Sequence, residues 1–165
     1  MVLCGMFAAL VAIGAFIQIP VPYMDYFTLQ FFFVLLAGLI LGADKGAISV
    51  GCYVLLGLVG VPIFAAGGGI GYIFRPSFGY LVGFIVSAYV TGKVCEKLKA
   101  SYKNYLLACL AGFVVTYAIG IVYKFIILNF YAHTPATLGV IFLSCFPLDM
   151  PGDFVSVSYT HLTLP

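Results

Sequence analysis

The chain has 165 residues, of which 64% are hydrophobic and only 7% are charged. A soluble domain averages about 25% charged residues, so this chain lacks the polar surface that a water-soluble particle of its size needs. We therefore expect an integral membrane protein. The formal net charge of +2 is too small to indicate binding to nucleic acid.

The first apolar segment covers residues 2–19 and can span a bilayer, for which about 20 apolar residues are needed. It has no charged leader and no A-x-A-like cleavage site, so we interpret it as a transmembrane helix rather than a signal peptide. Within it, Ala8 and Ala12 form a small-xxx-small pair, which permits another helix to approach closely. The spacing does not say whether that helix belongs to this chain or to another.

Four further spans follow, which we predict as helices over residues 28–42, 46–60, 76–92 and 104–128. The stretch 135–146 is too short to cross a bilayer and is typical of a half-helix or a capping segment. Pro151 would suit the first turn of a sixth span, because its missing N–H and fixed φ fit that position. Too few residues follow it to complete the span. The residues by themselves therefore predict an all-α membrane protein of about six spans, the last of them incomplete.

The longest polar piece of the chain lies between the fourth and fifth spans and carries Lys93, Lys97, Lys99 and Lys103. Positive residues in short loops mark the cytoplasmic side of a membrane protein. The N-terminus and the turn at residues 44–45 are then cytoplasmic as well. The outward connections are residues 18–27, 61–75 and 129–150. Loops on a rigid scaffold commonly carry function, so we expect recognition at the outer face.

The segment 60–80 holds six glycines and the only arginine of the chain, Arg75. Its spacing fits neither the dinucleotide-binding pattern G-x-G-x-x-G nor the phosphate-binding pattern G-x-x-x-x-G-K-[ST]. It is either a flexible outer turn or a re-entrant loop whose glycines let the backbone approach a ligand. In the second case Phe64 and Tyr72 would supply apolar walls. Arg75 is either an interfacial residue that reaches towards head groups or a fork that binds a carboxylate.

Other polar candidates lie in or beside the spans. Lys124 is deep in the fifth apolar run, where a charge indicates function unless the side chain reaches the outer interface. Asp153, in a Pro-Gly-Asp sequence, either caps a helix or accepts hydrogen bonds from a ligand. Tyr117 and Tyr123 either line a pocket or contribute to packing and an aromatic belt. Gln30 either bridges helices or touches a ligand.

The sequence shows no catalytic or metal-binding arrangement. His133 is alone in an outer stretch, His161 lies near the end, and the spans contain no serine–histidine–acid set and no pair of carboxylates. The five cysteines form no C-x-x-C pair and no cluster with histidine. We therefore interpret them as small hydrophobic residues buried in the helices. We therefore expect no enzyme, no metal site and no cofactor.

The order of these pieces resembles the BioY family, the biotin-binding S-components of energy-coupling-factor (ECF) vitamin transporters. The matching stretches are AALVAIGAFIQIPVP (8–22), YFTLQFFFVLLAGLILG (26–42), GAISVGCYVLLGLVGVPIFAAGGG (46–69), RPSFGYLVGF (75–84), YAIGIVY (117–123) and PGD (151–153). The most specific of them is the block G-V-P-x-F-A…GGG…P-S-x-G-Y. The resemblance covers about residues 8–154.

The resemblance implies a six-helix subunit of the bacterial cell membrane that binds biotin from outside and does no chemistry itself. Its partners would be an integral T-component, docked against Ala8 and Ala12, and two cytoplasmic ATPases. Asp153 would be the best ligand contact. The other substrate-binding candidates are Gln30, Phe64, Arg75, Tyr80, Tyr117, Tyr123 and Lys124. The alternatives are an S-component for another vitamin, a membrane enzyme and a structural subunit.

The end of the chain departs from the family pattern. The family continues the PGD sequence with a lysine three positions on and a long apolar helix, whereas this chain has Ser156 followed by VSYTHLTLP. That tail resembles translated adapter read-through. We therefore expect an all-α, six-helix S-component bundle whose sixth helix is truncated or replaced. It would form a single transmembrane domain over residues 1–154, followed by a non-native tail over residues 155–165.

Overall fold

The structure, a computed structural model, describes residues 1–19, 27–98, 101–131, 139, 141, 153 and 157–158. Their α-helices are α1 (Val2–Phe16), α2 (Gln30–Leu41), α3 (Ala43–Val59), α4 (Phe78–Lys97) and α5 (Tyr102–Ile126). The shorter elements are β1 (Gln18–Ile19), its antiparallel partner β2 (Phe27–Thr28), the 3₁₀ helix η1 (Ile70–Phe74) and the π-helix η2 (Ile127–Tyr131), which extends α5.

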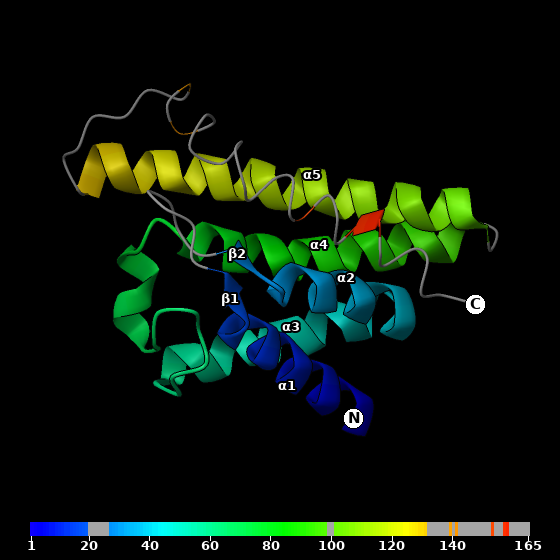
Figure 1. Ribbon diagram of the computed structural model, residues 1–165, viewed down its shortest axis with the longest axis horizontal. Helices are drawn as coiled ribbons and strands as arrows, with labels where there is room; N and C mark the ends of the chain where they lie inside the picture. Colours follow the sequence, from blue (N-terminus) through cyan, green and yellow to red (C-terminus); the bar gives the residue numbers. More distant parts are fainter. Residues whose placement is uncertain are drawn as a thin grey trace.

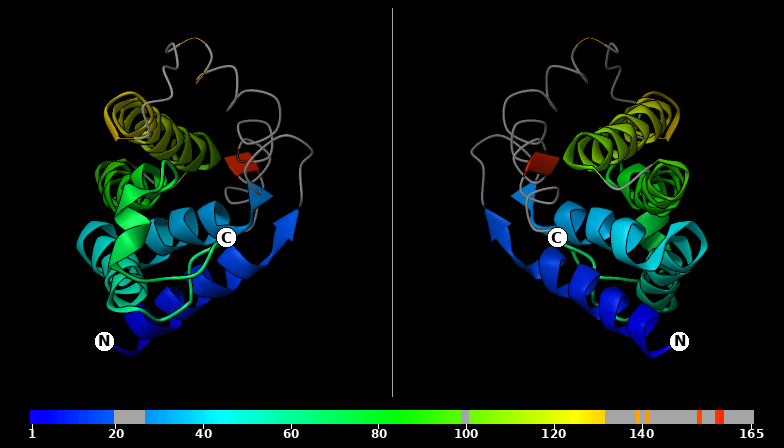
Figure 2. Two further views of the ribbon diagram at one scale, coloured as in Figure 1. Left: turned by 90° about the vertical axis from the view of Figure 1, so that its left-hand side faces the viewer. Right: turned by 90° about the vertical axis from the view of Figure 1, so that its right-hand side faces the viewer.

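Helix α4 is the centre of the arrangement. It packs against α5 on one side and against α2 and α3 on the other (Figure 1). Helix α1 crosses α2 and α3 at the far end of this stack, and the N-terminus lies there (Figure 2). The main hydrophobic core therefore forms around α2 and α4.

The predicted spans of the described part are confirmed as helices, with small shifts at their ends. α4 and the combined stretch of α5 and η2 are long and apolar enough to cross a membrane, whereas α1 and α2 are shorter apolar helices. α4 continues to Lys97, beyond the predicted end at residue 92, because charged residues end an apolar run without ending a helix. The expected half-helix at 135–146 and the expected start of a sixth span at Pro151 lie outside the described residues, apart from single positions.

Glycines set the distance between α4 and its neighbours. A Cβ atom on Gly38 of α2 would lie only 2.6 Å from the Ala88 carbonyl oxygen of α4, and one on Gly83 would lie 3.0 Å from the Thr116 carbonyl oxygen of α5. Gly92 is in equally close contact with the first residue of α3. Small residues at such contacts allow helix backbones to pack directly on one another, which is how helices associate in a membrane.

Polar side chains tie neighbouring helices together. The Ser49 hydroxyl of α3 donates to the Cys4 carbonyl oxygen of α1 at 2.7 Å. The Thr91 hydroxyl of α4 donates to the Ala108 carbonyl oxygen of α5 at 3.3 Å. Both hydroxyls are fully buried, so the hydrogen bonds satisfy groups that would otherwise be unpaired in an apolar environment.

Glu96 holds the turn between α2 and α3 against the end of α4. Only Gly42, with a φ of 81°, separates α2 from α3. The first N–H of α3, on Ala43, donates to Glu96 Oε1 at 2.9 Å, so a side chain of α4 caps α3. Lys93 Nζ lies 3.6 Å from the other carboxylate oxygen of Glu96. Glu96 therefore links the turn between α2 and α3 to the end of α4, in addition to the close backbone contact at Gly92.

Val157 packs into the main core although it falls in the expected non-native tail. Its side chain is fully buried among the core residues. Most of the other residues after Asp153 lie outside the described part. The division at residues 154 and 155 therefore stays a prediction.

The glycine contact between α2 and α4 gives a stability prediction. We expect Gly38→Ala to lower the free energy of unfolding by about 1–3 kcal/mol, because the added methyl group would overlap the α4 backbone. Gly51→Ala on α3 is the matched control, since its Cβ meets nothing within 4 Å and alanine favours helix. Thermal unfolding of the purified variants in detergent measures both. Equal unfolding temperatures for the two variants would contradict the close contact.

Candidate functional site

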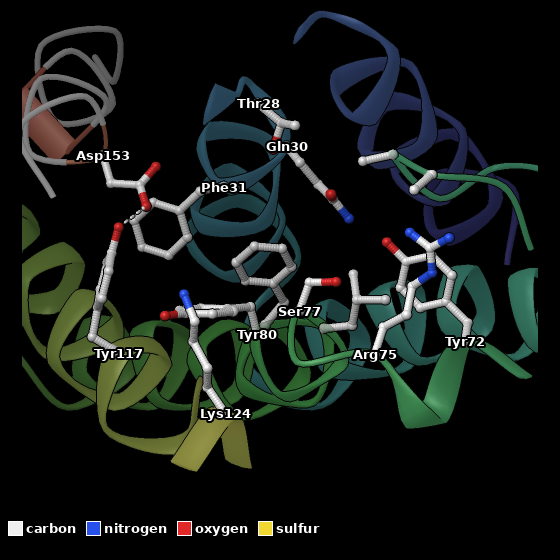
Figure 3. A pocket seen from close by; sticks show the side chains of 14 residues that line it. Thr28, Gln30, Phe31, Tyr72, Arg75, Ser77, Tyr80, Tyr117, Lys124 and Asp153 are labelled. Atoms are coloured by element: carbon white, nitrogen blue, oxygen red, sulfur yellow. Dashed lines mark hydrogen bonds between the residues drawn. The ribbon is translucent and has the colours of Figure 1, made fainter. Parts of the chain in front are cut away.

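A cavity of about 160 Å³ lies where β2, the η1 loop and the first turns of α2 and α4 face α5 (Figure 3). It is lined by Thr28, Gln30, Phe31, Ala65, Ala66, Tyr72, Arg75, Ser77, Tyr80, Leu81, Phe84, Tyr117, Lys124 and Asp153. A cavity of about 150 Å³ is known to hold a benzene-sized ring, so this one has room for the ring of a small organic molecule. The lining combines aromatic walls with a few polar groups, as ligand pockets commonly do.

The glycine-rich loop before the cavity is folded back on α3. Gly60, with a φ of 118°, ends α3 in the left-handed conformation. The Gly69 N–H then donates to the Gly57 carbonyl oxygen at 2.7 Å, and Phe64 and Gly67 exchange two backbone hydrogen bonds of 2.9 and 3.1 Å. These backbone hydrogen bonds give the segment a defined shape, and its placement as a re-entrant loop stays a prediction.

Phe64 supports the cavity wall from behind. Its ring lies directly over Gly57 and contacts the rings of Tyr53 and Tyr72, with centroids 5.5 and 4.6 Å away. Phe64 is 1% exposed and does not line the cavity, whereas Tyr72 does. The Tyr53 hydroxyl donates to the Ile63 carbonyl oxygen at 3.0 Å and holds the start of the loop. Phe64 therefore acts on the site through Tyr72.

Two cations lie on different sides of the cavity. The Arg75 guanidinium is 5.5 Å from the centre of the Tyr72 ring, a cation–π contact. Lys124 reaches the cavity from α5, near Tyr80 and on the side of Asp153 (Figure 3). Two cations and one carboxylate leave an excess of one positive charge in the lining, which favours an anionic ligand.

Asp153 is bound to a buried tyrosine of α5. The Tyr117 hydroxyl donates to Asp153 Oδ2 at 2.7 Å, and Tyr117 is only 4% exposed. The rings of Phe113 and Tyr80 pack against Tyr117 with centroids 4.7 and 5.8 Å away. The carboxylate is thus held at the cavity by a side chain whose own orientation is fixed by packing.

Gln30 presents an unsatisfied amide beside the cavity. It is 3% exposed, and its Nε2 atom has no hydrogen-bond partner among the described residues. The Gln30 side chain lies beside the Tyr53 hydroxyl as a hydrogen-bonding neighbour, but among the described residues this contact falls outside normal hydrogen-bond geometry and leaves Nε2 unsatisfied. Leaving a buried donor unpaired costs about 1–3 kcal/mol, so a ligand acceptor at this point would be favourable. Figure 3 shows the amide turned towards Arg75 and Tyr72.

Two tyrosines pack across the interface between α4 and α5, each against a glycine of the other helix. The Tyr80 ring of α4 lies on Gly120 of α5, and the side chain of Tyr123 of α5 lies on Gly79 of α4. Tyr80 lines the cavity, whereas Tyr123 is directed at the loop and donates to the Ile73 carbonyl oxygen. Of the two, only Tyr80 is in a position to contact a ligand in this cavity.

The structure therefore divides the substrate-binding candidates into two groups. Those that share the cavity are Gln30, Arg75, Tyr80, Tyr117, Lys124 and Asp153. Phe64 and Tyr123 lie behind its wall. The contact of each cavity residue with a ligand stays a prediction. No group of three or more histidine, cysteine, aspartate or glutamate side chains that could hold a metal ion occurs within the described ranges.

The cavity also contains residues that sequence reasoning missed. Phe31, Leu81 and Phe84 belong to apolar helices, where nothing in the sequence separates a cavity-facing ring or leucine from any other core residue. Ser77 directly precedes α4, and only its place after the Arg-Pro pair distinguishes it in the sequence from other polar residues.

The two alanines expected in a docking surface are turned towards this chain's own core. Ala8 is 7% exposed and belongs to the core, and Ala12 is partly buried against it. The exposed residues of α1 include Gly5, Ala9 and Ile13. Ala8 thus packs within this chain, which answers the question that its spacing left open. A role of this helix in docking stays a prediction.

Comparison with known proteins identifies relatives over most of the chain. A family model described as the BioY family matches residues 1–165. A protein of Lysinibacillus sphaericus named probable biotin transporter BioY is 40% identical over 155 residues, which cover 93% of this chain and 79% of that protein. Biotin transporter BioY of Thermotoga maritima is 45% identical over 130 residues, which cover 78% and 73%.

A solved structure has the same fold. It is described as the S-component for biotin from an ECF-type ABC transporter. It matches with a TM-score of 0.84 and 25% sequence identity, and the match covers 98% of this chain and 86% of that one.

The support of the cavity wall by Phe64 can be tested through stability. We expect Phe64→Ala to lower the free energy of unfolding by about 3–5 kcal/mol, because it empties the space between two rings. Ile70→Ala is the control in the same loop, since Ile70 is 71% exposed and should change stability by no more than about 0.5 kcal/mol. Thermal unfolding and limited proteolysis within residues 61–77 are the measurements. Equal proteolysis of both variants would exclude this role for Phe64.

Proposed function

We propose that this chain, which belongs to the BioY family, is the membrane-embedded subunit that binds biotin for uptake. The observation that carries the proposal is a cavity that unites aromatic walls, a carboxylate, an unpaired amide donor and two cations. The likeness to a solved S-component for biotin supports it.

Biotin has groups that match this lining. Its bicycle and chain are apolar, its ureido group has two N–H donors and a carbonyl, and its other end is a carboxylate. The aromatic rings of Phe31, Tyr72 and Tyr80 would pack against the apolar part. The carboxylate of Asp153 would accept ureido N–H groups, and a cation would bind the carboxylate.

The positions of the charges favour one orientation of the ligand. Lys124 and Asp153 lie on the same side of the cavity, so a ligand carboxylate there would meet the negative charge of Asp153 (Figure 3). Arg75 lies on the other side, and the Gln30 amide is turned towards it. We therefore assign the ligand carboxylate to Arg75 and the ureido group to Asp153.

The site would bind its ligand without changing it. Membership of a transporter family supports this role, and we infer that any energy comes from partner chains. The proposed partners are an ECF T-component and two cytoplasmic ATPases. A surface of α1 remains our proposal for docking the T-component. Gly5 and Ala9 are exposed there, whereas Ala8 is buried.

The chain is a membrane protein, and we propose that it has several spans with the cavity at the outer face. The exposed lysines Lys93, Lys97 and Lys103 lie at the end of α4 and the start of α5. The cavity lies at the opposite end of α4, around Arg75 and Tyr80. The preference of positive residues for the cytoplasmic side supports this orientation, with the N-terminus and residues 93–103 inside the cell.

Equilibrium binding of labelled biotin to the purified chain tests the function. We expect saturable binding, and we expect Asp153→Asn to weaken it at least about tenfold, because a charged acceptor is lost. Asp44→Asn is the matched control, since Asp44 is exposed at the start of α3, far from the cavity. Absence of saturable biotin binding would refute the proposal. Binding of another vitamin in its place would favour an S-component of different specificity.

A comparison of biotin with its neutral methyl ester tests the orientation of the ligand. We expect the wild type to bind the acid about tenfold more tightly than the ester, and Arg75→Gln to remove that difference. Lys124→Gln keeps the difference, because Lys124 lies beside Asp153. If Lys124→Gln alone abolishes the discrimination, the ligand lies the other way round.

A further inference from the structure

Tyr123 links the α5 helix to the loop that carries Arg75. Its hydroxyl donates to the carbonyl oxygen of Ile73, two residues before Arg75. The side chain reaches that point by crossing the first turn of α4 at Gly79, where a Cβ atom would collide with it. The Phe78 ring packs against it with centroids 5.9 Å apart. The hydroxyl is therefore aimed at the loop by packing of the side chain against Gly79 and Phe78.

The chain between Ile73 and α4 has little freedom. The Arg75 N–H donates to the Tyr72 carbonyl oxygen at 3.0 Å, and the Phe78 N–H donates to the Arg75 carbonyl oxygen at 3.0 Å. Arg75 itself is extended, with φ −82° and ψ 139°, as the residue before a proline usually is. A shift of Ile73 would therefore shift Arg75.

The guanidinium is oriented by few contacts. It lies over the Tyr72 ring, and no carboxylate of the described residues forms a salt bridge with it. A second contact holds the same loop from its exposed side, where Phe74 stacks on Tyr131 of η2 with centroids 4.8 Å apart. The direction of Arg75 thus depends on how firmly η1 is attached to α5.

We propose that Tyr123 is a positioning residue for Arg75, holding η1 so that the guanidinium stays aimed at the ligand carboxylate. This inference rests on the proposed function, which places an anionic ligand at Arg75. Bidentate binding of a carboxylate needs a guanidinium in a fixed orientation, so looser attachment of the loop lowers affinity for the acid. Neutral ligands of the same shape do not depend on that orientation.

A double-mutant cycle tests the proposal on the whole chain. Biotin and its methyl ester are bound to the wild type, Tyr123→Phe, Arg75→Gln and the double variant. We expect Tyr123→Phe to weaken biotin binding about three- to tenfold and to leave ester binding unchanged. In the Arg75→Gln background it causes no further loss, because the positioned group is gone. Tyr102→Phe, which removes an exposed hydroxyl at the other end of α5, is the control.

Several outcomes would overturn the proposal. Equal losses for acid and ester, or additive losses in the cycle, show that Tyr123 acts only on overall structure. If Arg75→Gln leaves biotin binding unchanged, the positioning role is excluded while the proposed function stands. If the wild type does not bind biotin, the proposed function itself is excluded. Should Tyr123→Phe fail to fold, Tyr131→Ala loosens the same loop from its exposed side. An unchanged biotin affinity in that variant overturns the proposal.

Discussion

The close approach of α4 to its neighbours is the constraint on which the rest of the structure depends. In a membrane the hydrophobic effect does not drive helices together, so contact between backbones has to do so. Gly38 permits it towards α2, and Gly92 permits it towards α3. On the α5 side, Gly112 accommodates the hydroxyl groups of Ser87 and Thr91. The helices thus meet at positions that no larger side chain could occupy.

Close contacts at glycines also shape the candidate site. Nearer the cavity, Gly120 accommodates the ring of Tyr80, and Gly79 accommodates the side chain of Tyr123. One tyrosine is thereby placed in the cavity, and the other is placed on the loop that carries Arg75. The contact between α4 and α5 therefore positions both a residue of the cavity and the loop beside it.

The sequence predicted the described helices and most of the polar cavity residues. Helices were found because the length of an apolar run is a local property, and an error such as the end of α4 arose where charges closed the run but not the helix. Arg75, Lys124 and Gln30 were found because a polar group in an apolar chain needs a physical reason. The sequence did not predict which aromatic rings face the cavity: Phe64 was expected in its wall but lies behind it.

What the sequence by itself determined is the order of the helices, the few polar side chains among them and the resemblance to a family, since these depend only on residue order and composition. Only the tertiary structure decided which side chains meet in the cavity. That depends on the rotation of each helix about its axis and on which glycine faces which ring. Tyr117 and Tyr123 lie on the same helix, yet one binds Asp153 and the other binds the loop. This follows from the packing of α5 on α4, which no local pattern encodes.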